Sequence, residues 1–269
     1  MAVITISRGA YSRGREIAEK VADRLNYKSI SKDLLHEVSK DYNISESKLE
    51  EAIHDAPGIL TRLKHKEEKY IAFIKSALLN HLKEDNVVYH GLAGHFFVKD
   101  VPHALKVRIL ADMEDRIQLE MERTGIDADK ARRMLEKDDE ERRKWGQRLY
   151  GIDTSDPRLY DLVINVNQLT VDDAADIICE SVSKRQYKTT LKSQRMIEDL
   201  ALSAAIQKAL IELAPDIRAC VDNRTAYIET EAAVGAEELL VKEIRDVVEN
   251  IEGISDVKVQ CHPIVALSE

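Results

Sequence analysis

The stretch ITISRGAYSRGREIAEKVADRL, residues 4–25, decides the fold class of this chain. An apolar run at residues 2–7 predicts a buried strand, and a glycine-containing turn follows it directly. Apolar side chains then recur at helical spacing, which predicts an amphipathic helix over residues 15–25. A strand, a turn and a helix in this order provide the setting in which a phosphate-binding loop occurs.

The turn has the glycines of a phosphate-binding loop but not its lysine. Gly9 and Gly14 keep the expected spacing, whereas Arg15 stands at the lysine position and Glu16 at the Ser/Thr position. The arginines of the turn would repel one another unless an anion lies among them, and a guanidinium can replace the lysine electrostatically. An ordinary turn between strand and helix is the alternative. The candidate phosphate-binding residues are Arg8, Gly9, Ser12, Arg13, Gly14, Arg15 and Glu16.

Apolar runs and helical patterns alternate through the first part of the chain, which predicts a parallel sheet with helices on both faces. Further strands are expected at residues 86–91, 105–111 and 159–166. Helices are expected at residues 31–39, with Ser31 as the N-cap, at 44–83 with a break at Pro57-Gly58, and at 112–123 and 171–183.

A polar, arginine-rich stretch at residues 127–158 interrupts this alternation. One interpretation is a solvated helical hairpin, in which the acids at 138–141 pair with Arg142 and Arg143 at helical spacing. The other is a mobile helical lid whose arginines close over phosphates. Trp145 and Tyr150 are expected to anchor this stretch.

The end of the chain has a different pattern. Residues 185–195 are polar and aperiodic, which is typical of a linker. A helix at 196–213, two alternating strands around a turn at Asn223-Arg224, a helix at 235–250 and a last strand at 254–261 then predict a small α+β domain.

The bulk composition limits the function classes. The net charge of −9 argues against a protein whose whole surface binds nucleic acid. No apolar run has the length of a membrane span, and the first residues do not have the pattern of a signal peptide. The three cysteines match no metal or redox spacing, so we expect reduced thiols in a cytoplasmic protein.

Three blocks of the sequence, taken together, resemble the cytidylate-kinase-like proteins, which are P-loop relatives of the nucleoside monophosphate kinases. The first block is the opening stretch with its Ser-Arg and Gly-Arg-Glu-Ile. The others are VVYHGLAGHFFVKDVPHALKVRILADMEDRI and DDEERRKWGQRLYGIDTSDPRLYDLVINVNQLTVDDAADII. The resemblance implies a P-loop kinase domain over residues 1–184, with a five-stranded parallel sheet and an arginine-rich lid, joined to the small α+β domain at 196–269.

The resemblance also implies roles for individual residues. The backbone at Ser12 to Arg15 would hold phosphates, and Arg142 with Arg148 would stabilise the transferring phosphoryl group. The implied catalytic set is Arg15, Asp139, Arg142 and Arg148. The substrates would be ATP, with Mg²⁺, and a nucleoside monophosphate such as CMP, and no separate metal site is expected.

Departures from the family pattern leave an alternative open. Tyr11 and Arg13 replace loop glycines, Ser31 replaces an acidic residue near Asp33, and Leu92 stands where an arginine is usual. A degenerate kinase fold that binds a nucleotide or another anion, and acts as a sensor through its C-terminal domain, is the second hypothesis.

Two further features complete the expectations. The C-terminal region is weakly similar to BON-type domains, which implies a small ligand or a protein as its partner, and a homodimer is compatible with the sequence. His90 and His95 flank the end of the strand expected at residues 86–91 and are expected to be core or loop histidines rather than metal ligands.

Overall fold

The structure, a computed structural model, describes residues 2–8, 12–31, 33–54, 61–91 and 93–264. The chain divides into two compact units. The larger consists of Met1–Lys64 and Glu84–Thr190, and the smaller of His65–Lys83 and Leu191–Glu269.

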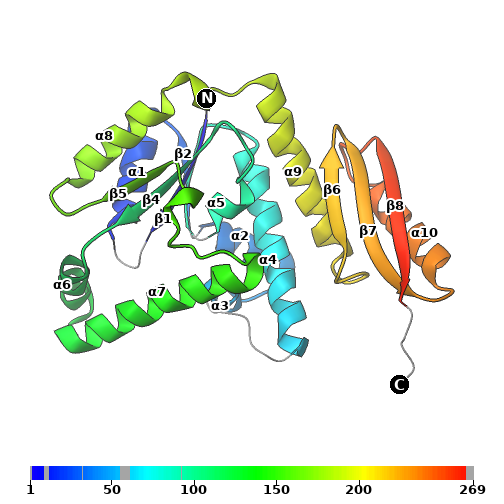
Figure 1. Cartoon of the computed structure of the whole chain (residues 1–269), viewed down its shortest axis with the longest axis horizontal. Helices are drawn as coiled ribbons and strands as arrows, with labels where there is room; N and C mark the ends of the chain where they lie inside the picture. Colours follow the sequence, from blue (N-terminus) through cyan, green and yellow to red (C-terminus); the bar gives the residue numbers. More distant parts are fainter. Residues whose placement is uncertain (1, 9–11, 32, 55–60, 92, 265–269) are drawn as a thin grey trace. The chain divides into compact units, whose positions relative to one another are not determined.

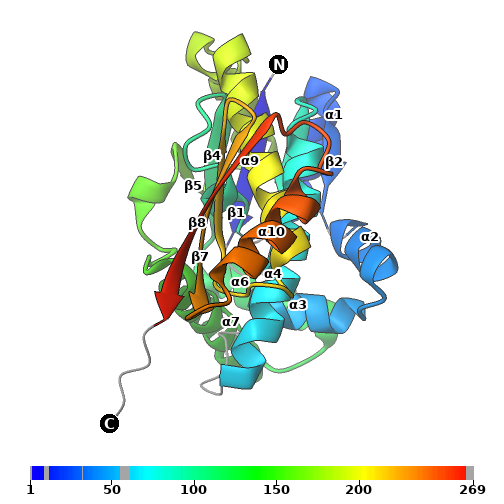
Figure 2. The same ribbon diagram turned by 90° about the vertical axis from the view of Figure 1, so that its right-hand side faces the viewer.

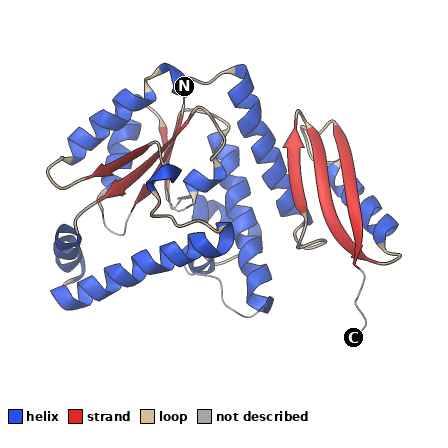
Figure 3. Ribbon diagram, in the orientation of Figure 1, coloured by secondary structure: helices blue, strands red, loops and turns tan. Residues whose placement is uncertain are grey.

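A five-stranded sheet forms the centre of the larger unit (Figures 1 and 3). Its strands are β1 (Val3–Arg8), β2 (Lys28–Ile30), β3 (Val87–His90), β4 (Ala104–Leu110) and β5 (Leu162–Asn165). They lie in the order β2-β3-β1-β4-β5, and every neighbouring pair is parallel. The P-loop-type parallel sheet expected from the sequence is therefore confirmed.

Helices lie between these strands along the chain, and one more, α8, follows β5. They are α1 (Gly14–Leu25), α2 (Asp33–Tyr42), α3 (Glu46–His54), α4 (Thr61–Leu82), α5 (Gly94–Phe97), α6 (Met113–Thr124), α7 (Ala128–Tyr150) and α8 (Val171–Val182). Thr170 caps α8 through a reciprocal pair of bonds with Asp173, which fixes its start where the sequence predicts it.

The two faces of the sheet differ in chemistry. One face packs on α1 and α8 through fully buried aliphatic residues such as Ile4, Ile6 and Val107. Side chains alternate along a strand, so the residues between these point to the other face. On β1 and β4 that face carries Thr5, Ser7, Lys106 and Arg108. Because this face of the central sheet is polar, we expect the functional site on this side of the sheet.

Most of the arginine-rich stretch forms one continuous helix, α7, so the interpretation of this stretch as a helical hairpin is wrong. Asp127 caps the helix by accepting a hydrogen bond from the Lys130 amide at 2.8 Å. The predicted ion pair between Glu140 and Arg143 is present at 2.8 Å. Buried Leu135 anchors the helix near its start, together with α6, and Trp145 anchors it near its end.

Several boundaries differ from the expectation. The three-residue β2 was missed, because so short a run carries no periodicity. Strand β5 begins at Leu162 rather than at residue 159, because Pro157–Leu159 form a 3₁₀ turn. Helix α2 begins at Asp33 rather than at residue 31. Pro57-Gly58 lies outside the described residues.

Besides most of α4, the smaller unit contains a helix, strand, strand, helix and strand in the predicted order, and Figure 2 shows its last helix most clearly. The elements are α9 (Leu191–Leu210), β6 (Arg218–Asp222), β7 (Thr225–Ala233), α10 (Glu237–Val248) and β8 (Asp256–Ile264). Asn223 and Arg224 both have positive φ, 48° and 63°, as a two-residue hairpin turn requires. Side chains of α9 and α10 pack on the same face of this sheet.

Helix α9 begins five residues earlier than expected, within the predicted linker. Its first turn is fixed by tertiary contacts that a polar sequence does not reveal: Ser193 is buried, and the Gln194 amide donates to the carbonyl of Lys83 at 2.8 Å. None of the described helices has an apolar stretch long enough to span a membrane.

Candidate functional site

The turn after β1 is attached to β4 at both ends. On the β1 side, Ser7 lies opposite Arg108 in the parallel register. On the α1 side, the buried Ser12 hydroxyl donates to the carbonyl of Ile109 at 3.2 Å. The two ends of the turn are therefore held against adjacent residues of one strand.

The residues just before α1 have the geometry of a tight turn. Arg13 adopts the left-handed conformation, with φ 58° and ψ 11°, at a position where the cytidylate-kinase-like pattern has glycine. A non-glycine residue there costs about 1–2 kcal/mol, and such strain is found where the surrounding structure fixes a functional turn. Glu16 is exposed in the first turn of α1, Arg8 ends β1, and Gly9 lies outside the described residues.

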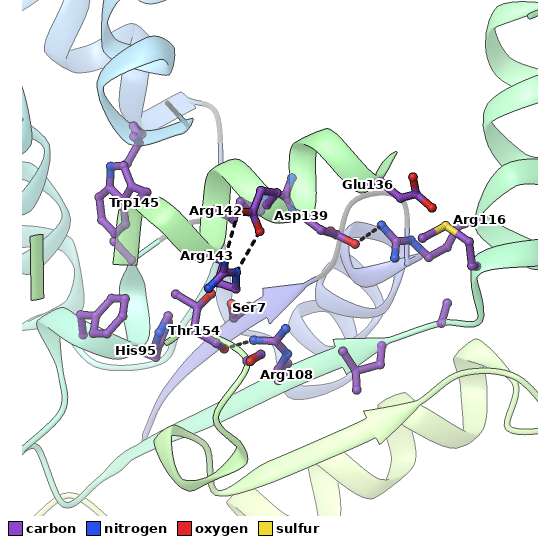
Figure 4. A pocket seen from close by; sticks show the side chains of 18 residues that line it. Ser7, His95, Arg108, Arg116, Glu136, Asp139, Arg142, Arg143, Trp145 and Thr154 are labelled. Atoms are coloured by element: carbon purple, nitrogen blue, oxygen red, sulfur yellow. Dashed lines mark hydrogen bonds and ion pairs between the residues drawn. The ribbon is translucent and has the colours of Figure 1, made fainter. Parts of the chain in front are cut away.

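A cavity of about 380 Å³ opens over the polar face of the sheet (Figure 4). Its floor includes Ser7 and Arg108, and one wall is α7. The lining includes the arginines Arg108, Arg116, Arg142 and Arg143, the carboxylates Glu136, Asp139 and Glu140, and the aromatic residues His95, Phe96 and Trp145. Arginines and aromatic rings together suit a ligand with both phosphate groups and a planar base.

Carboxylates hold two of these arginines in place. The buried guanidinium of Arg116 lies 2.8 Å from Asp139, which joins α6 to α7. Arg143 is held by Glu140 on its own helix through two hydrogen bonds of 2.9 and 2.8 Å. Asp139, an expected catalytic residue, thus orients an arginine of the cavity wall.

A buried polar cluster lies at the floor of this cavity. The Tyr160 hydroxyl donates to the carbonyl of Thr154 at 3.0 Å and lies 3.4 Å from Nε2 of His95. Burial, together with the nearby Arg108 and Lys106, lowers the pKa of His95 to about 3, so its ring is neutral at physiological pH. His95 is therefore a core histidine, as expected from the sequence, but its ring also lines the cavity.

A second cavity, of about 570 Å³, lies at the carboxyl end of β3. It is lined by residues of α1, β2, α2, α3, β3 and α7, among them Arg15, Ser31, Asp33, Glu50, His90 and Arg142. Arg15 is exposed and pairs with Glu19 one turn further along α1 at 2.7 Å. The lining of the second cavity therefore offers carboxylates, hydroxyls and guanidinium groups to one ligand.

Arg142 lies in the wall of both cavities, as does Ile53. The structure thus brings together three of the expected catalytic residues: Asp139 with Arg142 in the first cavity, and Arg15 with Arg142 in the second. Arg148 is exposed and lines neither cavity. It is six residues beyond Arg142, which places it about 120° away around the helix axis.

The comparisons with known proteins agree with this architecture. The model of the cytidylate kinase-like family matches residues 3–168. The chain belongs to the cytidylate kinase-like family. It is 30% identical over 192 residues to a cytidylate kinase of Archaeoglobus fulgidus, covering 70% of this chain and 99% of that protein.

Other members and one solved structure are similarly related. The chain is 27% identical to a cytidylate kinase of Sulfolobus acidocaldarius, covering 70% of this chain and 98% of the relative. A crystal structure of an uncharacterized protein from Eubacterium ventriosum matches with a TM-score of 0.52 at 26% identity, over 68% of this chain and 99% of that one. The family match ends before α9, so it does not describe the strands of the smaller unit.

For this member of the cytidylate kinase-like family, sequence reasoning missed two arginines of the first cavity. Arg108 leaves a signal in the sequence, because charged Lys106 and Arg108 alternate with apolar residues within a central strand. Arg116 leaves none, since an arginine in an amphipathic helix is usually a surface residue, and only the fold buries it.

Proposed function

We propose that this chain transfers the terminal phosphoryl group of ATP to a nucleoside monophosphate such as CMP. The observation that carries the proposal is the position of Arg142, which lines both cavities. A cation common to two adjacent ligand sites can stabilise a phosphoryl group as it passes from one ligand to the other. The relatives named cytidylate kinase support this activity.

The chemistry of the lining is consistent with phosphoryl transfer. An oxygen of the acceptor phosphate attacks the terminal phosphorus of ATP, and the bond from that phosphorus to the bridging oxygen breaks. The attacking oxygen is already ionised, so no general base has to remove a proton. The protein's task is then to position two anions and to neutralise charge. Arg116, held by Asp139, and Arg142 provide for that task.

Mg²⁺ fits these residues as an ion carried by the nucleotide. Among the described residues, no group of three or more His, Cys, Asp or Glu side chains could hold a metal ion by itself. Mg²⁺ in such sites is bound mainly by phosphates and water, with one or two carboxylates. Asp139 and Glu140 in the first cavity are paired with Arg116 and Arg143, so Glu136 is the carboxylate of this lining that would hold the ion. When bound with ATP, the ion would neutralise phosphate charge.

The test compares turnover with binding. ADP release is measured with Mg²⁺ and ATP in the presence of CMP, UMP, dCMP, AMP or GMP, and ATP affinity is measured by calorimetry. Arg142→Ala should lower kcat about a thousandfold, as loss of a charge-stabilising arginine does, and should change the Kd for ATP far less. Arg133→Ala is the matched control, because Arg133 is exposed on the same helix and lines neither cavity.

The outcomes separate the hypotheses. Turnover with one of the monophosphates and its loss in Arg142→Ala would support the proposal. Binding of ATP by the wild-type chain without turnover on any acceptor would contradict it and favour the nucleotide-sensor alternative.

A further inference from the structure

Arg108 lies beside both ends of the turn that follows β1. It is opposite Ser7, the second-last residue of β1, and it precedes Ile109, whose carbonyl accepts the Ser12 hydroxyl. The side chain of Arg108 therefore lies next to both ends of the turn: the end of β1 and the start of α1.

The guanidinium of Arg108 faces the first cavity (Figure 4). Ser7 and Arg108 share a sheet face, opposite the one that packs on α1 and α8, and both line the cavity. The group is half-buried and lies with its centre 5.4 Å from the centre of the Tyr160 ring. The strand and the tyrosine thus fix the position of this cation.

Among the described residues, Arg108 has no ion pair, although the Asp153 carboxylate acts on its charge from a longer distance. Its Nη1 donates to two neutral oxygens, the carbonyl of Thr154 and, at 3.2 Å, the hydroxyl of Tyr160. Within the described residues no carboxylate lies at ion-pair distance from it, whereas Arg116 and Arg143 in the same cavity each have one. A half-buried cation without a carboxylate is stabilised when an anion enters.

The remaining donors have the geometry that a phosphate needs. A guanidinium offers five N–H groups in a planar fork, and the two neutral oxygens use only those of Nη1. Within the described part of the chain, Nε and Nη2 of Arg108 make no hydrogen bond to protein. The turn after β1 contains no lysine, whereas phosphate-binding loops carry one there.

We infer that Arg108 binds a phosphate group of the donor nucleotide from β4, next to a turn that has no lysine and whose Arg15 is paired with Glu19. This inference rests on the proposed function, and it takes the first cavity, which is lined by Ser7 and Arg108 beside the turn after β1, as the site of the donor. The competing role is structural: Arg108 would only hold the segment of Thr154 and Tyr160 against the sheet.

Three variants separate the two roles. Arg108→Gln removes the charge, Arg108→Lys keeps it, and Tyr160→Phe removes one hydrogen-bond partner of Arg108 while leaving the guanidinium. The Kd values for ATP and for inorganic tripolyphosphate are measured by calorimetry, together with Tm, and KM is measured for ATP and for the monophosphate acceptor.

Phosphate binding predicts that Arg108→Gln raises the Kd for both polyphosphates about tenfold or more, that Arg108→Lys recovers part of the loss, and that Tyr160→Phe stays close to the wild-type Kd. Equal Kd values in the wild type and Arg108→Gln, with Tm lowered alike in Arg108→Gln and Tyr160→Phe, would overturn the inference. A rise in KM for the acceptor alone would also overturn it.

The two proposals can fail separately. Turnover by the wild-type chain decides the proposed function, whereas the difference in polyphosphate Kd between the wild type and Arg108→Gln decides the role of Arg108. A wild-type chain that binds neither ATP nor tripolyphosphate would overturn both.

Discussion

Replacing Gly146 by alanine tests how closely α7 packs on the segment that follows it. Glycine inside a helix is ordinarily unfavourable, and alanine at such a site would add about 1 kcal/mol of stability. Here a Cβ at position 146 would lie 2.5 Å from Cγ2 of Thr154 and 3.0 Å from the carbonyl oxygen of Ile152. The first distance is shorter than real Cβ contacts allow and the second is tighter than most of them, so the helix or the segment must move.

The segment cannot move freely, because the carbonyl of Thr154 accepts hydrogen bonds from Arg108 and from the Tyr160 hydroxyl. Overpacking of this kind costs about 1–3 kcal/mol, and the fixed neighbour places Gly146→Ala near the upper end of that range. Subtracting the gain in helix propensity leaves a net loss of about 2 kcal/mol, which corresponds to a fall in Tm of about 4–8 °C.

The assay is thermal unfolding of the wild type, Gly146→Ala, Thr154→Ala and the double variant. Thr154→Ala removes the nearer contact atom and leaves the carbonyl bonds of residue 154 in place. The double variant should therefore be more stable than the sum of the two single changes predicts, by about 1 kcal/mol. A Gly146→Ala protein as stable as the wild type, or more stable, would refute the reasoning.

Two further predictions concern charge and protonation. Arg15→Ala should raise KM for the monophosphate about tenfold and leave KM for ATP nearly unchanged, because Arg15 lines the second cavity; initial rates with each substrate varied in turn check this, and a larger change for ATP would contradict it. Because the folded-state pKa of His95 is lowered to about 3, the unfolded chain binds more protons below pH about 6.5, so acidification from about 6.5 towards 3 should lower the free energy of unfolding by up to about 1.4 kcal/mol per pH unit. Denaturant unfolding of the wild type and His95→Asn across that range measures the effect, and parallel profiles of the two proteins would count against a buried neutral His95.

The sequence predicts the parts of the fold that depend on local patterns. The strand, turn and helix at residues 2–25 are marked by apolar periodicity and glycines, and the hairpin at Asn223-Arg224 by its turn residues. The described residues of the first strand and helix, and the hairpin, lie where the sequence places them. The three-residue β2 gives no such signal, because its residues form a strand only by pairing with β3.

The candidate site was predicted only in part, because some of its residues leave a local pattern in the sequence and others are brought in by the fold. Arg142 and Asp139 occur in a stretch whose composition and family resemblance single them out. Arg116 enters the cavity only because α6 packs on α7, and the sequence around it reads as an ordinary helix face. The direction of Arg148 is likewise decided by the rotation of α7, once that stretch forms one helix instead of two.

The division of the chain into two units has a consequence for any gene that encodes a part of it. The polypeptide passes between the units at residues 64–65, 83–84 and 190–191, so no single breakpoint separates them. A message ending after residue 190 would still encode Lys69 and Lys75 but would omit Glu212 and Gln207, their neighbours within the smaller unit. A chain shortened at residue 190 would therefore keep one part of the smaller unit without the other part.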